Sequence, residues 1–112
     1  MSFKLIPNPT FFASVFLTIP GKDEPGKIEF EFRHKTPGEL DAWLDEVKAK
    51  RAKDVVPDII HGWNKEDVEG EDGNFVPFSP AALEKLLHTY SPAGQEILTG
   101  YITALTESRA KN

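Results

Sequence analysis

The middle of the chain reads Ile59-Ile60-His61-Gly62-Trp63, continues through an acidic loop at 64–74, and resumes as Phe75-Val76-Pro77-Phe78-Ser79-Pro80. An apolar pattern with helical spacing ends at Gly62, and large aromatic residues stand on both sides of the loop. Ser79-Pro80 predicts a helix start, because serine caps free backbone N–H groups and proline already has the backbone angle of a first turn. The stretch therefore predicts a loop whose two ends are fixed to one core while its tip stays in water.

The residues before this stretch predict an N-terminal arm followed by a β-hairpin. Pro7 and Pro9 discourage both helix and strand pairing in residues 1–10. Apolar residues alternate between the two sides of 11–19, and they alternate with charged residues in 28–33, which is typical of strands. Because an isolated hairpin is only marginally stable in water, we expect helices to cover its apolar face.

Helix starts are easily recognised in the rest of the chain, at Thr36-Pro37, Ser79-Pro80 and Ser91-Pro92. Apolar residues follow each start at helical spacing, among them Leu40, Trp43, Leu44, Val47, Leu83, Leu86, Leu87, Tyr90, Ile97, Leu98, Tyr101, Ile102 and Leu105. A further short helix, capped by Asp54, is expected to carry Val55, Val56, Ile59, Ile60 and Trp63. The sequence thus predicts an α+β fold in one domain over 1–112. The arm and antiparallel β-hairpin occupy 1–35, and they pack against a mainly helical part of about four helices in 36–112.

Length and charge exclude several classes of protein. A chain of 112 residues has the size of one domain, and the absence of cysteine rules out disulfides, thiolate metal sites and thiol nucleophiles. That absence also fits a reducing compartment, so we expect the cytoplasm. A formal charge of −5 argues against nucleic-acid binding, which needs clustered Lys and Arg. No apolar run reaches the roughly 20 residues that span a bilayer, so we expect no membrane association.

The acidic loop raises the question of calcium binding, because Asp67, Glu69 and Glu71 alternate along it. A calcium-binding EF-hand loop also needs a glycine at its sixth position and a bidentate glutamate at its twelfth. Counted from Asp67, those positions hold Asp72 and Phe78. The loop is therefore interpreted as a solvated segment that keeps the domain soluble.

No group of residues in the sequence has the pattern of a catalytic or metal site. His34, His61 and His88 lie far apart and match no zinc-binding spacing. Ser79 and Ser91 are explained as helix caps, and the glycines form no phosphate-binding cluster. We therefore expect no catalytic residue, no metal site and no cofactor.

Aromatic residues are the candidates for binding a partner: Phe12, Phe16, Trp63, Phe75 and Phe78. Those that flank the acidic loop either pack beneath it as core or stand partly exposed as anchors of an interface, and core packing is the simpler interpretation. Phe12 and Phe16 lie on the second side of the first strand, where at least one of them is expected to face a partner.

Several features follow one another along the second half of the chain: Gly62-Trp63, Glu71-Asp72-Gly73-Asn74, Val76-Pro77-Phe78-Ser79, Leu83-x-x-Leu86-Leu87, and a closing helix with Ile97, Tyr101 and Leu105 before Lys111-Asn112. Together they resemble the tail assembly chaperones of tailed bacteriophages and their prophages. The resemblance implies a non-enzymatic protein of the bacterial host cytoplasm that binds the tape-measure protein and keeps its hydrophobic helices soluble. It further implies help in recruiting tail-tube subunits, self-association as a homo-oligomer around the client, and absence from the mature virion.

Two other classes of function remain open at this point. One is a small enzyme or metal-binding protein that uses the acidic loop with a histidine. The other is a small regulatory or antitoxin-like module that binds a basic partner through its negative surface. Saturable binding of calcium, magnesium or zinc would favour the first, and solubilisation of a tape-measure protein would separate the chaperone from the second.

Overall fold

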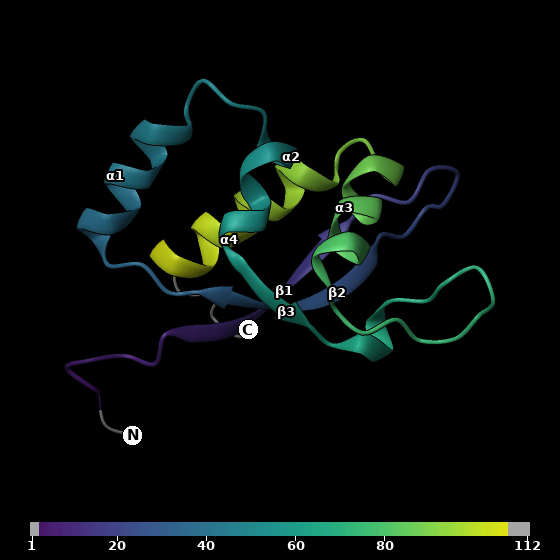
Figure 1. Cartoon of the computed structure of the whole chain (residues 1–112), viewed down its shortest axis with the longest axis horizontal. Coiled ribbons are helices and arrows are strands. Elements are labelled where there is room, and N and C mark those ends of the chain that lie inside the picture. Colours follow the sequence, from purple (N-terminus) through teal and green to yellow (C-terminus); the bar gives the residue numbers. More distant parts are fainter. Residues whose placement is uncertain (1–2, 108–112) are drawn as a thin grey trace.

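The computed structural model describes residues 3–107, which form a three-stranded antiparallel sheet with helices gathered over one of its faces (Figure 1). The strands are β1 (Thr10–Leu17), β2 (Gly26–Arg33) and β3 (Ile60–Trp63), in the order β1-β2-β3. The helices are α1 (Pro37–Val47), α2 (Ala52–Val55), α3 (Pro80–Thr89) and α4 (Ala93–Thr106), with short 3-10 turns η1 (Val56–Asp58) and η2 (Lys65–Asp67). The α+β prediction is confirmed.

The hairpin of β1 and β2 forms as the alternation predicts. Val15 and Leu17 of β1 are buried, and Phe30 and Phe32 of β2 are fully buried, while the residues between them face outward. The register places Val15 opposite Ile28 and continues antiparallel through both strands. Alternation therefore puts one face of the hairpin in the core and leaves the other uncovered.

The prediction of one short helix through Trp63 is wrong, because Ile60–Trp63 forms the third strand. The helical part is only α2, whose N-cap position is held by Arg51 rather than Asp54 and has no side-chain cap, and Pro57 lies in η1 where the helix ends. Arg33 N–H donates to Ile59 O at 2.8 Å, so the backbone leaves the helix to pair with β2. Glu31 pairs with Gly62 and Phe32 with Ile60, so His61 is the extra residue of a bulge in β3, and this bulge brings both Ile60 and Trp63 onto the inner face. The predicted hairpin is thus part of a larger sheet.

Two of the predicted helix starts have the expected caps. Thr36 and Glu39 form a capping box at α1, and Ser79 accepts from the N–H of Ala82 at α3. The start of α4 differs, because Pro92 occupies the cap position and no side-chain cap is formed there. The chain turns tightly between the two helices, with Ala93 N–H donating to Tyr90 O at 3.1 Å, and Ser91 falls inside that turn.

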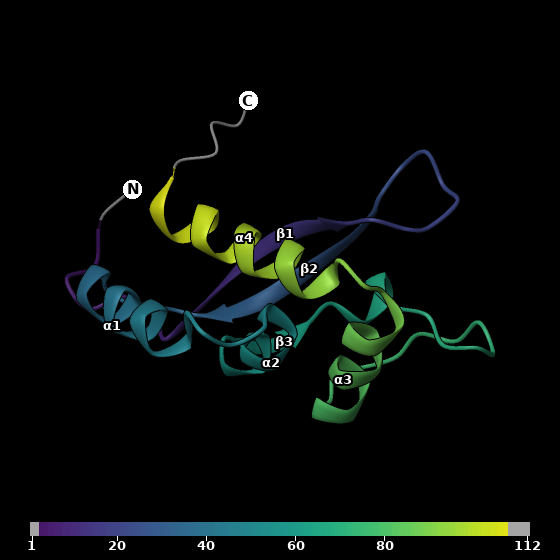
Figure 2. The same cartoon turned by 90° about the horizontal axis from the view of Figure 1, so that it is seen from above.

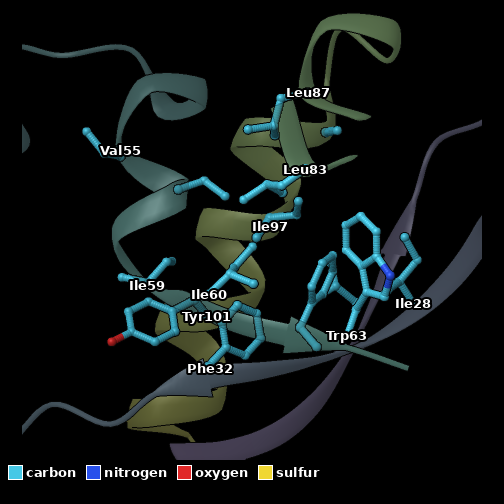
Figure 3. Packing of buried hydrophobic residues seen from close by; sticks show 14 of the residues in the cluster. Ile28, Phe32, Val55, Ile59, Ile60, Trp63, Leu83, Leu87, Ile97 and Tyr101 are labelled. Carbon is cyan, nitrogen blue, oxygen red and sulfur yellow. The ribbon is translucent and has the colours of Figure 1, made fainter. Parts of the chain in front are cut away.

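The core lies between the inner face of the sheet and the helices, with α4 running over β1 and β2 (Figure 2). Tyr101 of α4 is fully buried, its ring centroid lies 5.1 Å from that of Phe32, and its hydroxyl donates to Arg33 O at 2.8 Å. Figure 3 shows Tyr101 against Phe32 at one end of the core and Trp63 at the other. Desolvation, and secondarily the charge of Glu39, raises the pKa of Tyr101 to about 12.

Candidate partner-binding surfaces

The outer face of the sheet presents both phenylalanines that the sequence singles out. Phe12 is 63% exposed and Phe16 is 60% exposed, and both project from β1. The register sets Phe12 beside Glu31 and Phe16 beside Lys27, so that an apolar strand is flanked by charged positions of β2. Large exposed apolar residues with a charged rim are typical of an interaction surface.

Trp63 lies in the core instead, at 8% exposure, and holds the returning end of the acidic loop. Its indole N–H donates to Val76 O at 2.9 Å, and its ring meets the Phe78 ring edge-on at a centroid distance of 5.2 Å. Val76 N–H in turn donates to Val68 O at 2.9 Å, which joins the two sides of the loop. Trp63 and the partly buried Phe78 therefore fix the loop to the sheet.

Phe75 is the exposed aromatic residue beside the loop, at 51% exposure. It lies opposite Glu69 in an isolated antiparallel bridge near the base of the loop. Within the loop, hydrogen bonds from the backbone N–H and the side-chain amide of Asn74 hold the pKa of Asp72 below its usual value. Asp72 thus keeps its negative charge in the loop that the exposed Phe75 borders.

A groove of about 820 Å³ separates the acidic loop from α3, and the sequence gives little sign of it. Leu86 and Tyr90 match the buried stripe of a helix, yet both are only partly buried and line this groove. Acidic residues and one lysine lie at its sides: Glu69, Glu71, Asp72 and Lys85. A neighbouring hollow of about 170 Å³ shares Leu86 and Tyr90 and extends toward the hairpin.

The structure brings the three histidines to separate places. His34 packs edge-on against Phe11, His61 is exposed in β3, and His88 lies 3.8 Å from Glu84 on the exposed side of α3. Within residues 3–107, no three His, Cys, Asp or Glu side chains are grouped closely enough to hold a metal ion. In the same described range, no helix has the length and apolar character needed to cross a membrane.

Comparison with known proteins gives one family. No curated protein and no solved structure matches the chain. One family model, described as phage tail assembly chaperone, matches residues 1–112, the whole chain. The match covers the exposed sheet face, the Trp63-anchored loop and the helices together. The chain belongs to the phage tail assembly chaperone family.

Proposed function

We propose that this chain is a non-enzymatic chaperone that binds the tape-measure protein in the bacterial host cytoplasm and helps recruit tail-tube subunits during tail morphogenesis. It leaves the assembly before the virion is mature. The observation that carries the proposal is an uncovered sheet face with two exposed phenylalanines, Phe12 and Phe16, in a member of this family. Copies of the chain are proposed to self-associate around the client.

The proposed client consists of long apolar helices, which need apolar contact and a soluble escort. The outer face of β1 supplies the apolar contact through Phe12 and Phe16, and Phe75 adds another exposed ring beside the acidic loop. A formal charge of −5 keeps the complex in solution. Trp63 and Phe78 contribute by fixing the loop that carries Phe75, since Trp63 is buried and Phe78 packs against it.

Co-expression with the tape-measure protein tests the proposal. We expect the client to be soluble with the wild-type chain and to precipitate without it. Phe12→Ser/Phe16→Ser should lose this effect, because it removes both rings from an exposed face at little cost in folding. Phe3→Ser is the matched control, since Phe3 is also an exposed phenylalanine but lies in the arm before β1. A client that is equally insoluble with and without the wild-type chain would contradict the proposal.

Calorimetry of the purified chain separates the alternatives. Saturable micromolar binding of calcium, magnesium or zinc would favour a metal-dependent protein over a chaperone. Tight binding of a basic partner at the acidic loop, with no effect on the client, would favour a regulatory or antitoxin-like module. The chaperone proposal predicts neither result.

A further inference from the structure

β1 is an edge strand, and the direction of its free backbone groups follows from one hydrogen bond. His34 N–H donates to Pro9 O at 2.9 Å, so this pair is a hydrogen-bonded pair of the β1–β2 ladder. Hydrogen-bonded pairs alternate along an antiparallel ladder. The neighbouring residue of β2 agrees with this alternation, because the N–H of Arg33 points away from β1 and donates to Ile59 O. The outward N–H and C=O groups of β1 therefore belong to Phe12, Ser14 and Phe16.

These outward groups have no hydrogen-bond partner among residues 3–107. The strand is closed at one end, because Thr18 donates to the Glu96 carboxylate of α4 through both its N–H and its hydroxyl. The open part of the edge is thus limited to 12–16. An unpaired edge of this kind is a template for another strand.

Space for a strand exists beside this edge. A groove of about 350 Å³ runs between β1 and α4. Its α4 side carries the uncharged Gln95, Thr99 and Thr103, together with Glu96, whose carboxylate accepts from Thr18. α4 comes close to β1 at Gly100, where an added Cβ would lie 2.8 Å from a methyl group of Val15. The groove therefore has a polar wall, mostly uncharged, that is fixed against the strand.

The sequence of the edge is self-complementary. Read in either direction from Ser14, the segment Thr10-Phe11-Phe12-Ala13-Ser14-Val15-Phe16-Leu17-Thr18 presents the same classes of side chain. An antiparallel second copy centred on Ser14 would place Phe12 opposite Phe16 of that copy, and cross-strand aromatic pairs stabilise a sheet. On the outer face, Glu31 lies beside Phe12 and Lys27 beside Phe16. Each cross-strand row of the paired sheet would therefore run from Glu31 through the two phenylalanines to Lys27 of the second copy, with opposite charges at its ends.

We propose that two copies of this chain pair through β1, antiparallel and about a two-fold axis at Ser14, to form one continuous sheet. Three hydrogen-bonded pairs would exchange about six backbone hydrogen bonds, two for each pair. The contact is isologous, so it closes with two copies and places the exposed phenylalanines of both in one apolar patch. This inference rests on the self-association in the proposed function and names the surface that mediates it.

Charge substitutions test both the surface and the register. The wild-type chain should sediment at high micromolar concentration with nearly twice its mass of 12.5 kDa, and dissociate on dilution. Phe12→Lys/Phe16→Lys sets lysine opposite lysine, and should weaken the dimer by more than about a hundredfold. Phe12→Lys/Phe16→Glu sets lysine opposite glutamate in the same register, and should sediment as a dimer. Both variants change only exposed side chains, and circular dichroism checks that they fold.

A single cysteine gives a second readout, since the chain has none of its own. Ser14→Cys places two thiols across the axis, at a Cα separation of about 5.5 Å that a disulfide can span. Mild oxidation should link this variant into a covalent dimer, while the control Ala81→Cys, on the exposed side of α3, stays monomeric.

The proposal is overturned by a wild-type chain that stays monomeric, or by association that the double-lysine variant leaves intact. Loss of the dimer in the lysine–glutamate variant, or equal cross-linking of the two cysteine variants, rejects the register. These masses are measured without client, so they stand whether or not the wild-type chain keeps the tape-measure protein soluble. If a strand of the client, and not a second copy, occupies this edge, the wild type and both double variants will all be monomeric in these measurements.

Discussion

Truncating Trp63 to alanine is the sharpest test of how the fold holds the acidic loop. Trp63 is only 8% exposed; its ring packs against Phe30 and Phe78, and its indole N–H donates to Val76 O. Large-to-small changes of buried aromatic residues cost about 3–5 kcal/mol. The lost donor leaves a backbone carbonyl unpaired where water reaches it only partly, so we place the cost of Trp63→Ala at the upper part of that range.

Urea unfolding followed by far-ultraviolet circular dichroism measures this cost. With a denaturant slope of about 1–3 kcal/mol per molar urea, the midpoint should fall by roughly 2 M. Trp63→Phe separates the two contributions, because it keeps most of the ring contacts and removes the donor to Val76 O, at a cost of about 1–3 kcal/mol. Amide exchange at Val76, whose N–H bonds to Val68 O, should accelerate in both variants.

Phe75→Ala is the matched control, since Phe75 borders the same loop but is half exposed, and its midpoint should change much less. Equal midpoints for the wild type and Trp63→Ala would refute the reasoning. That result would mean that Trp63 is not a core residue and that its ring is free to contact a partner.

Further predictions concern stability. Gly94→Ala should destabilise the chain by about 1–3 kcal/mol, measured by urea unfolding, because the new Cβ would lie 2.8 Å from the backbone nitrogen of Lys53. Gly38→Ala is the control, since its Cβ has open space and should gain up to about 1 kcal/mol in helix propensity. Equal effects of the two substitutions would contradict the close approach of α2 and α4. The raised pKa of Tyr101 means that the folded state holds this proton more tightly than the unfolded state, so the contribution of Tyr101 to stability is fully present below pH 10 and should fall by roughly 2–3 kcal/mol as pH rises from 10 through 12. Tyr101→Phe should remove that part of the alkaline loss, and an identical pH profile in the variant would count against it. The proposed single domain predicts one cooperative thermal transition for the whole chain, with coincident circular dichroism and fluorescence curves; two separated transitions would show independent units.

The hairpin and the helix starts were predictable because their signals are local. Alternation over 11–19 determines which side chains of β1 are buried, and the box of Thr36 and Glu39 starts α1 within one turn of chain. The third strand was not predictable in the same way. The apolar run before Gly62 is short enough to suit a helix or a strand, and pairing of Ile59 with the distant Arg33 decides between them.

The candidate surfaces also differ in whether a local pattern or a long-range contact determines them. The sequence predicts that Phe12 and Phe16 share one side of a strand and that at least one of them faces a partner; the structure shows that both are exposed. The different fates of the aromatic residues around the acidic loop depend on how its returning end docks on Trp63, a contact that no local pattern encodes. The free edge at Ser14 becomes visible only once the strand order is known, although the self-complementary segment around it was there to be read.

Quantitative co-purification of the tape-measure protein with the tagged chain tests the central claim most directly. The account predicts that the wild type and Phe3→Ser retain the client. Phe12→Ser/Phe16→Ser should retain about tenfold less client or still less, because the anchors of the interface are lost. Retention of the client by the double variant at the wild-type level would contradict the claim that the uncovered face of β1 binds it.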